Sequence, residues 1–180
     1  MSSPRNDLAL FEQTMLPHLA AAYNLARWIM DNDQDAEDVV QEAYLRAFQY
    51  FVGFHGGSER SWLLTIVRNT CYTWLRQNRS QGQVVELDED LAESENVSAD
   101  PEAALQLRID SQQVKSALQK LPAEFRELLV LRELEGLAYK EIAGVTGIPI
   151  GTVMSRLARA RQQLKRCLAA LEDREGKNGL

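Results

Sequence analysis

Apolar residues recur at steps of three and four along both ends of the chain, a spacing typical of amphipathic helices. In the first third the pattern runs over residues 11–29 and returns over residues 36–48, after the polar run "DNDQ". The Gly-rich break "GFHGGSER" follows, and a third such stretch covers residues 61–76. Further helical patterns cover residues 101–121 and the segment after Pro122, a residue that suits a first helical turn. Only a short "VVELD" alternates apolar and polar residues, so the sequence predicts an all-α protein.

The segment from residue 141 to residue 166 predicts a helix-turn-helix motif. Gly147 permits a positive φ, and Pro149 cannot continue a preceding helix. A helix, a tight glycine-containing turn and a second helix make up that motif. At 100° per residue, the second helix has an apolar stripe and an opposite polar face, with Arg156 and Arg161 on the two flanks. The stripe holds Val153, Leu157, Ala160 and Leu164, and the opposite face holds Ser155, Arg159, Gln162 and Arg166.

Charge is unevenly distributed along the chain, which has 20 basic and 26 acidic side chains and a formal net charge of -6. Residues 80–105 contain eight acidic and no basic side chains, whereas residues 151–166 contain five basic and no acidic ones. A purely basic helix after a Gly/Pro turn favours duplex DNA as its partner, because arginines can read base edges while other cations contact phosphates. Free backbone N–H groups at Gly151 and Thr152 can also take a phosphate. The alternative is an ordinary helix with a solvated basic face.

The acidic middle segment divides the chain. It has few large apolar residues and a block of like charge, which predicts a flexible linker. The predicted organisation is an N-terminal helical domain over residues 1–79, an acidic flexible linker over 80–105, a C-terminal helix-turn-helix domain over 106–172 and a disordered tail over 173–180.

Two stretches of the N-terminal domain carry polar groups suited to partners. The helix predicted over residues 35–51 presents Asp35, Asp38, Gln41 and Glu42 away from its apolar stripe. This pattern indicates either a surface helix whose first carboxylates favour the helix dipole, or an acidic patch that docks on a basic protein surface. Residues 61–80 mix aromatic and basic side chains. That mixture suits single-stranded nucleic acid, and it equally suits a helix whose aromatic residues face the core.

Other classes of function lack their motifs in this sequence. His18 and His55 have no Cys or acidic residue at metal-ligand spacing, and no nucleophile-elbow, P-loop or dinucleotide motif occurs. Cys71 and Cys167 suggest no disulfide framework, and Cys71 is expected to be a buried small residue. No apolar run approaches the roughly 18 residues of a membrane span, and no secretory signal is visible. We therefore expect a cytoplasmic protein that is not an enzyme, uses no cofactor, metal or small-molecule substrate, and does not insert into a membrane.

Three stretches, in this order, resemble the extracytoplasmic-function (ECF) sigma factors of bacterial RNA polymerase. They are "DAEDVVQEAYLRAF", similar to that family's polymerase-binding helix, "FHGGSERSWLLTIVRNTCYTWLR", similar to its promoter-melting segment, and "LPAEFRELLVLRELEGLAYKEIAGVTGIPIGTVMSRLARARQQL", similar to its C-terminal DNA-reading domain. The resemblance covers nearly the whole chain and implies two helical domains joined by a flexible linker. One departure is Ala138, which stands where the family often has a Ser or Thr cap. Its presence forfeits roughly 1 kcal/mol of local helix stability.

The resemblance also implies roles for individual residues. Asp35, Asp38, Gln41 and Glu42 would dock on the clamp helices of the largest polymerase subunit. The loop over residues 54–61 would hold a base flipped out of the melted non-template strand at the −10 element, and the helix after it would support that strand. The residues expected at the −10 element are Phe54, Gly56, Ser61, Trp62, Asn69 and Arg76, and those expected at the duplex −35 element are Thr152, Ser155, Arg156, Arg159 and Arg161.

A protein of this kind is an alternative sigma factor, which binds core RNA polymerase, directs it to promoters and helps to open the DNA. The family also implies an anti-sigma factor that holds the two domains in a closed form. Two alternatives stay open at this point. One is a stand-alone helix-turn-helix regulator that binds a palindrome as a dimer. The other is a sigma-like decoy that sequesters an anti-sigma factor, although a decoy has no reason to keep a basic reading face.

Overall fold

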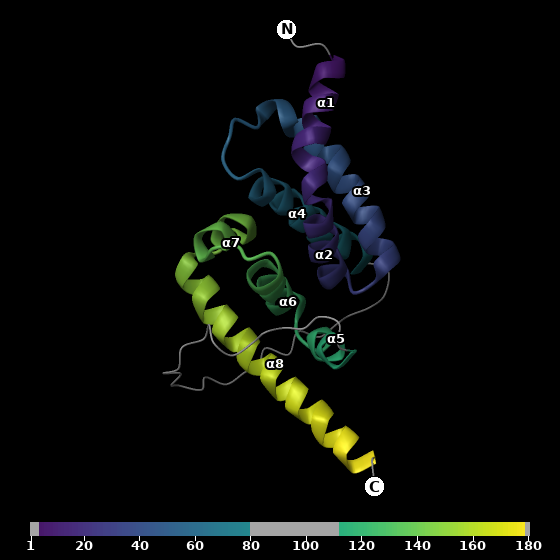
Figure 1. Cartoon of the computed structure of the whole chain (residues 1–180), viewed down its shortest axis with the longest axis vertical. Helices are drawn as coiled ribbons and strands as arrows, with labels where there is room; N and C mark the ends of the chain where they lie inside the picture. Colours follow the sequence, from purple (N-terminus) through teal and green to yellow (C-terminus); the bar gives the residue numbers. More distant parts are fainter. Residues whose placement is uncertain (1–3, 80–111, 179–180) are drawn as a thin grey trace.

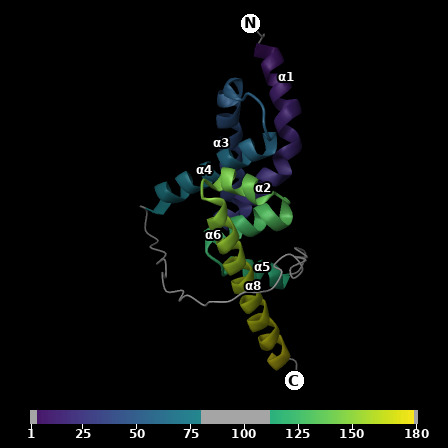
Figure 2. The same ribbon diagram turned by 90° about the vertical axis from the view of Figure 1, so that its left-hand side faces the viewer.

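The chain folds into two helical lobes that contact each other (Figure 1). A computed structural model describes residues 4–79 and 112–178. Every regular element in these two ranges is a helix, which confirms the all-α prediction. The predicted acidic linker over residues 80–105 lies outside the described residues. Helix α1 (Pro4–Met15) projects from one end of the long axis, and helix α8 (Ile150–Asn178) projects from the other, as Figure 2 also shows.

The N-terminal lobe has an interruption early in its first helical stretch. After α1 comes the 3₁₀ turn η1 (Leu16–His18), where Pro17 removes a backbone donor. The helical pattern over residues 11–29 is therefore divided between two helices. The lobe continues with α2 (Leu19–Met30), α3 (Asp33–Tyr50), the 3₁₀ turn η2 (Phe51–Gly53) and α4 (Glu59–Arg79).

Helices α2, α3 and α4 pack against one another around an apolar core, and aromatic contacts attach α1 to it. The ring of Phe11 meets the rings of Phe48 and Phe51 edge-on, with ring centres 5.2 Å apart in both pairs. The Tyr44 hydroxyl donates a hydrogen bond to the carbonyl of Met15 at 2.9 Å. These contacts fix α1 against α3 and η2. The large, fully buried side chains of the lobe include Met15, Leu25, Ile29, Leu63 and Leu64.

The described part of the C-terminal lobe contains a π-helical turn that the sequence analysis does not predict. The elements are α5 (Gln112–Gln119), α6 (Ala123–Leu129), the π-helical turn η4 (Val130–Leu134), α7 (Tyr139–Thr146) and α8. The Glu135 N–H donates to the carbonyl of Val130, five residues back, at 3.0 Å. The buried core of this lobe includes Leu118, Leu128, Leu129, Leu131, Leu137, Ile142 and Leu157.

Helices α7 and α8 form the predicted helix-turn-helix. Gly147 ends α7 in the left-handed conformation, with φ 73°, and its N–H donates to the Ala143 carbonyl at 2.9 Å. Helix α8 begins directly after Pro149, whose carbonyl accepts from the Val153 N–H at 3.0 Å. The predicted stripe is fully buried in the structure: Val153, Leu157, Ala160 and Leu164.

Helix α8 is longer than the sequence analysis predicts. The disordered tail expected over residues 173–180 is wrong for residues 173–178, because α8 continues to Asn178. Residues 179–180 lie outside the described residues. Leu168 and Leu171 are half-buried against the core. They continue the apolar stripe of α8 beyond its last fully buried member, Leu164. Residues 172–178 include Glu, Arg and Lys, which have high helix propensity, and no Pro.

The two lobes meet through α2 and α4 on one side and α6 and α7 on the other (Figure 1). Between them, Nε and Nη2 of Arg68 donate to the two carboxylate oxygens of Glu127 at 2.7 and 3.0 Å. Only 19% of the Arg68 side chain and 3% of the Glu127 side chain are exposed. The partners are 59 positions apart in the sequence, so no local pattern predicts this pair.

Helix α7 has only half of a capping box. Ala138 precedes the helix in an extended conformation, and its N–H donates to the Glu141 carboxylate at 2.8 Å. Alanine has no side-chain oxygen to accept a bond in return. We expect Ala138→Ser to complete the box and to raise the free energy of unfolding by about 1 kcal/mol in urea denaturation.

The control for this substitution is Ala9→Ser, because Ala9 is exposed in the interior of α1. A serine there is expected to lower the free energy of unfolding by about 0.5 kcal/mol, since it has a lower helix propensity than alanine. A loss of stability at both positions would contradict the capping argument.

Candidate nucleic-acid and protein interfaces

The four residues predicted to bind polymerase all lie on α3, but they are not equally accessible. Asp38 and Gln41 are exposed, whereas Asp35 and Glu42 are half-buried. Glu42 forms an ion pair with Arg46, one turn later on the same helix. Asp38 and Gln41 are therefore the members of this set that are most available to a partner.

An exposed leucine extends the same surface, and the sequence analysis missed it. Leu45 is 66% exposed and follows Gln41 by one turn. At 100° per residue, Asp38, Gln41 and Leu45 share one face of α3, and we call this face the α3 patch. A large exposed apolar side chain beside polar ones is typical of a protein-binding surface. The signal was present in the sequence, because Leu45 falls on the polar side of the predicted helix.

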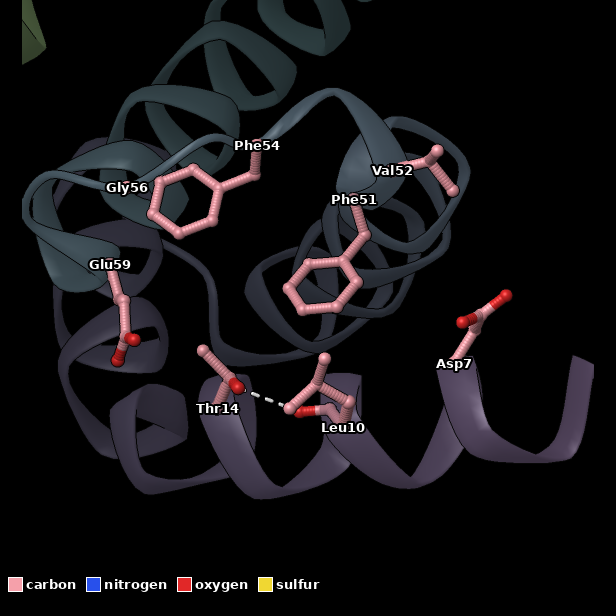
Figure 3. A pocket seen from close by; sticks show the side chains of 8 residues that line it. All are labelled: Asp7, Leu10, Thr14, Phe51, Val52, Phe54, Gly56 and Glu59. Atoms are coloured by element: carbon pink, nitrogen blue, oxygen red, sulfur yellow. Dashed lines mark hydrogen bonds between the residues drawn. The ribbon is translucent and has the colours of Figure 1, made fainter. Parts of the chain in front are cut away.

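A cavity of about 510 Å³ opens between α1 and the loop after η2 (Figure 3). In Figure 3 the rings of Phe51 and Phe54 point toward it from the loop side, and Leu10 and Thr14 lie opposite them on α1. The two aromatic rings give the cavity flat apolar surfaces. Its lining consists of Asp7, Leu10, Thr14, Phe51, Val52, Phe54, Gly56 and Glu59.

The polar groups of this cavity are hydrogen-bond acceptors. Asp7 and Glu59 contribute carboxylates at its two ends (Figure 3), and Glu59 lies 3.9 Å from Nε2 of His18. The Thr14 hydroxyl already donates to the Leu10 carbonyl at 2.7 Å, so its remaining capacity is to accept. A flat group that carries N–H donors fits such a surface, whereas the two carboxylates repel a phosphate.

Two glycines shape the loop that borders the cavity. Gly56 and Gly57 have φ of 92° and 99°, a conformation that side-chain-bearing residues rarely adopt. The ring of Phe54 stacks on Phe51, with centres 6.4 Å apart, and lies 4.9 Å from Trp62. The structure thus brings together three of the predicted −10 residues, Phe54, Gly56 and Trp62.

The remaining predicted −10 residues lie on α4. Trp62, Asn69 and Arg76 are seven positions apart and so share one face, with about 10.5 Å of helix rise between successive members. Asn69 and Arg76 are exposed, and Trp62 is half-buried. Ser61 differs, because its Oγ is buried and has no hydrogen-bond partner within the described residues. Its N–H donates to the Ser58 hydroxyl at 3.2 Å, a contact that caps α4.

The predicted −35 residues lie along the start of α8. Ser155 and Arg159 are exposed, and Thr152 is half-buried. The Ser155 hydroxyl donates to the Thr152 carbonyl at 3.2 Å. Arg156 is half-buried, with Nη1 3.7 Å from the carboxylate of Glu124 on α6. Arg159 is therefore the most accessible arginine of the predicted set.

Arg161 is held by an acidic partner inside the lobe. Its side chain is 8% exposed, and its Nε and Nη2 donate to one oxygen of Glu133 at 3.0 and 2.7 Å. Burial disfavours the charged guanidinium, but the hydrogen bonds to Glu133 outweigh it and keep the pKa of Arg161 above its usual value. The helical wheel could not identify this role, because Glu133 is 28 positions away.

Cys71 does not contribute a reactive group to these surfaces. Cys71 is fully buried, as expected, and burial raises the pKa of its thiol to about 12. A neutral, inaccessible thiol is a poor nucleophile. Within residues 4–79 and 112–178, no group of three His, Cys, Asp or Glu side chains is placed to hold a metal ion, and no helix is long and apolar enough to cross a membrane.

Comparison with known proteins assigns each lobe to a family. Residues 15–81 match Sigma-70 region 2, and residues 111–164 match Sigma-70, region 4. The ECF RNA polymerase sigma-E factor of Escherichia coli is 36% identical over 72% of this chain and 72% of its own length. The chain belongs to the ECF sigma factors.

Other relatives of this sigma factor extend the match. The RNA polymerase sigma-H factor of Pseudomonas aeruginosa is 33% identical over 93% of this chain and 90% of its own length. The ECF RNA polymerase sigma factor SigE of Mycolicibacterium smegmatis is 35% identical over 88% of this chain. This sigma factor spans 62% of that relative, less than two thirds of its length.

Solved structures share the two-lobed fold. The sigma factor RpoE from Bartonella quintana, solved in complex with the anti-sigma factor NepR, has a TM-score of 0.68 and 33% identity over 88% of this chain and 96% of its own. CnrH, solved with the cytosolic domain of CnrY, has a TM-score of 0.61 at 24% identity and shares the fold. Each lobe is under half of the chain, so a match over 88% includes both. A stand-alone helix-turn-helix regulator does not account for a region 2 match in the N-terminal lobe.

Arg159 and Arg161 of this sigma factor are expected to respond differently to truncation. Arg161→Ala leaves Glu133 without its partner and is expected to lower the free energy of unfolding by about 3 kcal/mol. Arg159→Ala removes an exposed side chain and is expected to change it by less than about 0.5 kcal/mol. Urea denaturation of the two variants tests this difference. A similar loss of unfolding free energy in both variants would show that the Arg161–Glu133 pair does not stabilise the fold.

Proposed function

We propose that this sigma factor divides promoter-directed initiation between its lobes. The N-terminal lobe binds core RNA polymerase and the melted −10 strand, and the C-terminal lobe reads the duplex −35 element. The observation that carries this proposal is the separation of charge: an exposed carboxylate on α3, Asp38, and an exposed guanidinium on α8, Arg159. The protein acts by binding and catalyses no bond chemistry itself. We place it in the cytoplasm, where polymerase meets the chromosome.

The α3 patch fits a basic protein surface. The carboxylate of Asp38 can form charge-assisted hydrogen bonds with arginine or lysine, which steer association as well as strengthening it. Leu45 adds apolar area beside it. The clamp helices of the largest polymerase subunit are the partner that the family resemblance names.

The cavity beside α1 fits an extruded base at the −10 element. The rings of Phe51 and Phe54 supply surfaces for stacking, and stacking offsets part of the cost of unstacking the base from the duplex. The carboxylates of Asp7 and Glu59 accept hydrogen bonds, so they favour a base with an exocyclic amino group, as in cytosine or adenine. Asn69 and Arg76 on α4 then meet the strand outside the cavity.

The exposed face of α8 fits the major groove of a duplex. Arg159 can donate a fork of two hydrogen bonds to guanine, and Ser155 can contact a neighbouring base or phosphate. Thr152 lies in the first turn of the helix, where backbone N–H groups bind a phosphate. We leave Arg161 out of this surface, because Glu133 holds it inside the lobe.

An anti-sigma factor is the regulatory partner that we propose. The solved relative RpoE is in complex with the anti-sigma factor NepR, and this chain matches it over both lobes. A partner that contacts both lobes at once would hold the lobes together. It would thereby prevent the proposed −10 and −35 surfaces from binding a promoter.

The decisive test is transcription in vitro with purified core polymerase on genomic DNA, with start sites mapped by sequencing the RNA. A sigma factor is expected to produce discrete start sites that share −10 and −35 sequences. A sigma-like decoy or a stand-alone DNA-binding regulator gives no discrete starts, and that result would refute the proposal.

Arg159→Ala is expected to reduce discrimination for the −35 element roughly tenfold to hundredfold, because a bidentate arginine–guanine contact is lost. The measurement is the ratio of RNA from a mapped promoter to RNA from the same promoter with a scrambled −35 element. Arg174→Ala is the matched control, since Arg174 is exposed on the same helix about 22 Å farther along. Equal effects of both substitutions would count against a reading role for Arg159.

Asp38→Arg is expected to weaken binding to core polymerase at least about tenfold, because it places a cation against a basic surface. Fluorescence anisotropy of labelled protein titrated with core enzyme measures the change. Asp173→Arg makes the same charge change at an exposed site on the other lobe and is expected to leave the affinity unaltered. An unchanged affinity for Asp38→Arg would remove α3 from the proposed interface.

A further inference from the structure

Two exposed apolar side chains lie at the start of α8, beside the residues proposed to read the −35 element. Ile150 is 49% exposed and Met154 is 52% exposed, so neither is part of the buried core of the lobe. They are four positions apart, which places them one turn apart on the same flank of the helix. Neither the packing of the helix-turn-helix nor the proposed contacts of Ser155 and Arg159 explain this exposed pair.

Met154 belongs to the part of α8 that enters the major groove. The recognition helix of a helix-turn-helix contacts base edges with its N-terminal residues, and Met154 lies in the second turn of α8. Around the helix, Ser155 lies between Met154 and Arg159, about 100° from the first and about 40° from the second. A helix with its side chains is roughly 10–12 Å across, and the major groove is about 12 Å wide. Side chains on both flanks of the inserted face therefore reach the groove.

The chemistry of Met154 and Ile150 restricts what this flank can bind. A thioether or an aliphatic side chain carries no charge and donates no hydrogen bond, so it gains nothing from a phosphate. Among the groups that base pairs present in the major groove, the C5-methyl group of thymine is the apolar one. Contact between the methyl group and these side chains removes apolar surface from water on both partners. Thymine is therefore the base that this flank of α8 fits.

Ser155 supplies a second contact at the same level of the duplex. Its hydroxyl donates to the Thr152 carbonyl at 3.2 Å, so its remaining capacity is to accept. The donors that bases present in the major groove are the amino groups of adenine and cytosine. Ser155 follows Met154 by about 1.5 Å of helix rise, less than the roughly 3.4 Å between base pairs. One A·T pair thus offers an amino group to Ser155 and a methyl group to Met154.

We propose that Met154, with Ile150 beside it, is a specificity-determining residue that contacts the C5-methyl group of a thymine in the −35 element. This inference rests on the proposed function, because it requires α8 in the major groove. Arg159 follows Met154 by about 7.5 Å of helix rise, which corresponds to about two base-pair steps. The thymine therefore lies about two base pairs from the guanine that Arg159 contacts.

The test removes the methyl group and leaves the hydrogen-bonding groups of the base unchanged. Each thymine of a mapped −35 element is replaced in turn by deoxyuridine, which lacks only the C5-methyl group. Competition binding then measures the affinity of core polymerase with this sigma factor for each promoter fragment. One replacement, about two base pairs from the guanine to which Arg159→Ala has become insensitive, is expected to weaken binding about twofold to fourfold. A loss of this size corresponds to one methyl group buried in part or in full.

Variants of Met154 show whether this side chain senses the methyl group. Met154→Ala is expected to bind the thymine and deoxyuridine fragments equally, because no side chain is left to meet the methyl group. Met154→Leu keeps an apolar side chain of similar volume and is expected to retain the preference for thymine. The matched control is Leu16→Ala, which removes an apolar side chain with 51% exposure from the other lobe and is expected to keep the wild-type preference. Circular dichroism checks that all variants keep their helix content.

The inference is overturned if wild type binds every deoxyuridine fragment as tightly as its thymine counterpart, or if the mapped −35 elements contain no thymine. It is also overturned if Met154→Ala keeps the wild-type preference for thymine. If that variant binds both fragments more weakly by the same factor, the side chain contacts a protein surface instead. Each of these results leaves the proposed function intact. The absence of any discrete start site refutes the proposed function and this inference with it.

Discussion

The placement of the two lobes relative to each other depends on a buried ion pair. The buried apolar cluster includes residues of both lobes. Between them, Arg68 and Glu127 remove two opposite charges from water and repay part of that cost with two hydrogen bonds. Burial raises the pKa of the Glu127 carboxyl, and the hydrogen bonds from Arg68 oppose that shift. The ion pair thus adds more to the specific geometry of the interface than to its net stability.

The fold could be predicted where apolar residues recur with a helical period. The pattern over residues 36–48 becomes α3, that over 61–76 becomes α4, and Gly147 marks the turn of the helix-turn-helix. Features that depend on backbone hydrogen bonding were missed, such as the interruption at Pro17 and the π-helical turn of η4. The sequence analysis also did not predict the extension of α8 to Asn178, where few apolar residues remain but the local helix propensity stays high.

The sequence predicts the candidate sites only where all of their residues lie on one helix. A helical wheel places Arg159 and Arg161 on different sides of α8, but it cannot show that Glu133 binds Arg161. The cavity beside the loop that follows η2 likewise needs Asp7, which lies some fifty positions before Glu59 and on another helix. The family resemblance predicts the loop on one side of the cavity, but it does not predict that α1 lines the other side. Contacts between distant segments, rather than local pattern, decide which of the predicted residues are free to bind.

The contact between the lobes combines polar pairs, such as Arg68–Glu127, with the packing of α2 on α6 and of α4 on α7. An apolar interface would hold the lobes together more firmly, but opening would expose an apolar patch, which favours aggregation or the wrong partner. Charged groups such as Arg68 and Glu127 are well solvated when the lobes separate, so opening carries a smaller penalty. A boundary that contains charged pairs fixes how the lobes meet through groups that water can also solvate.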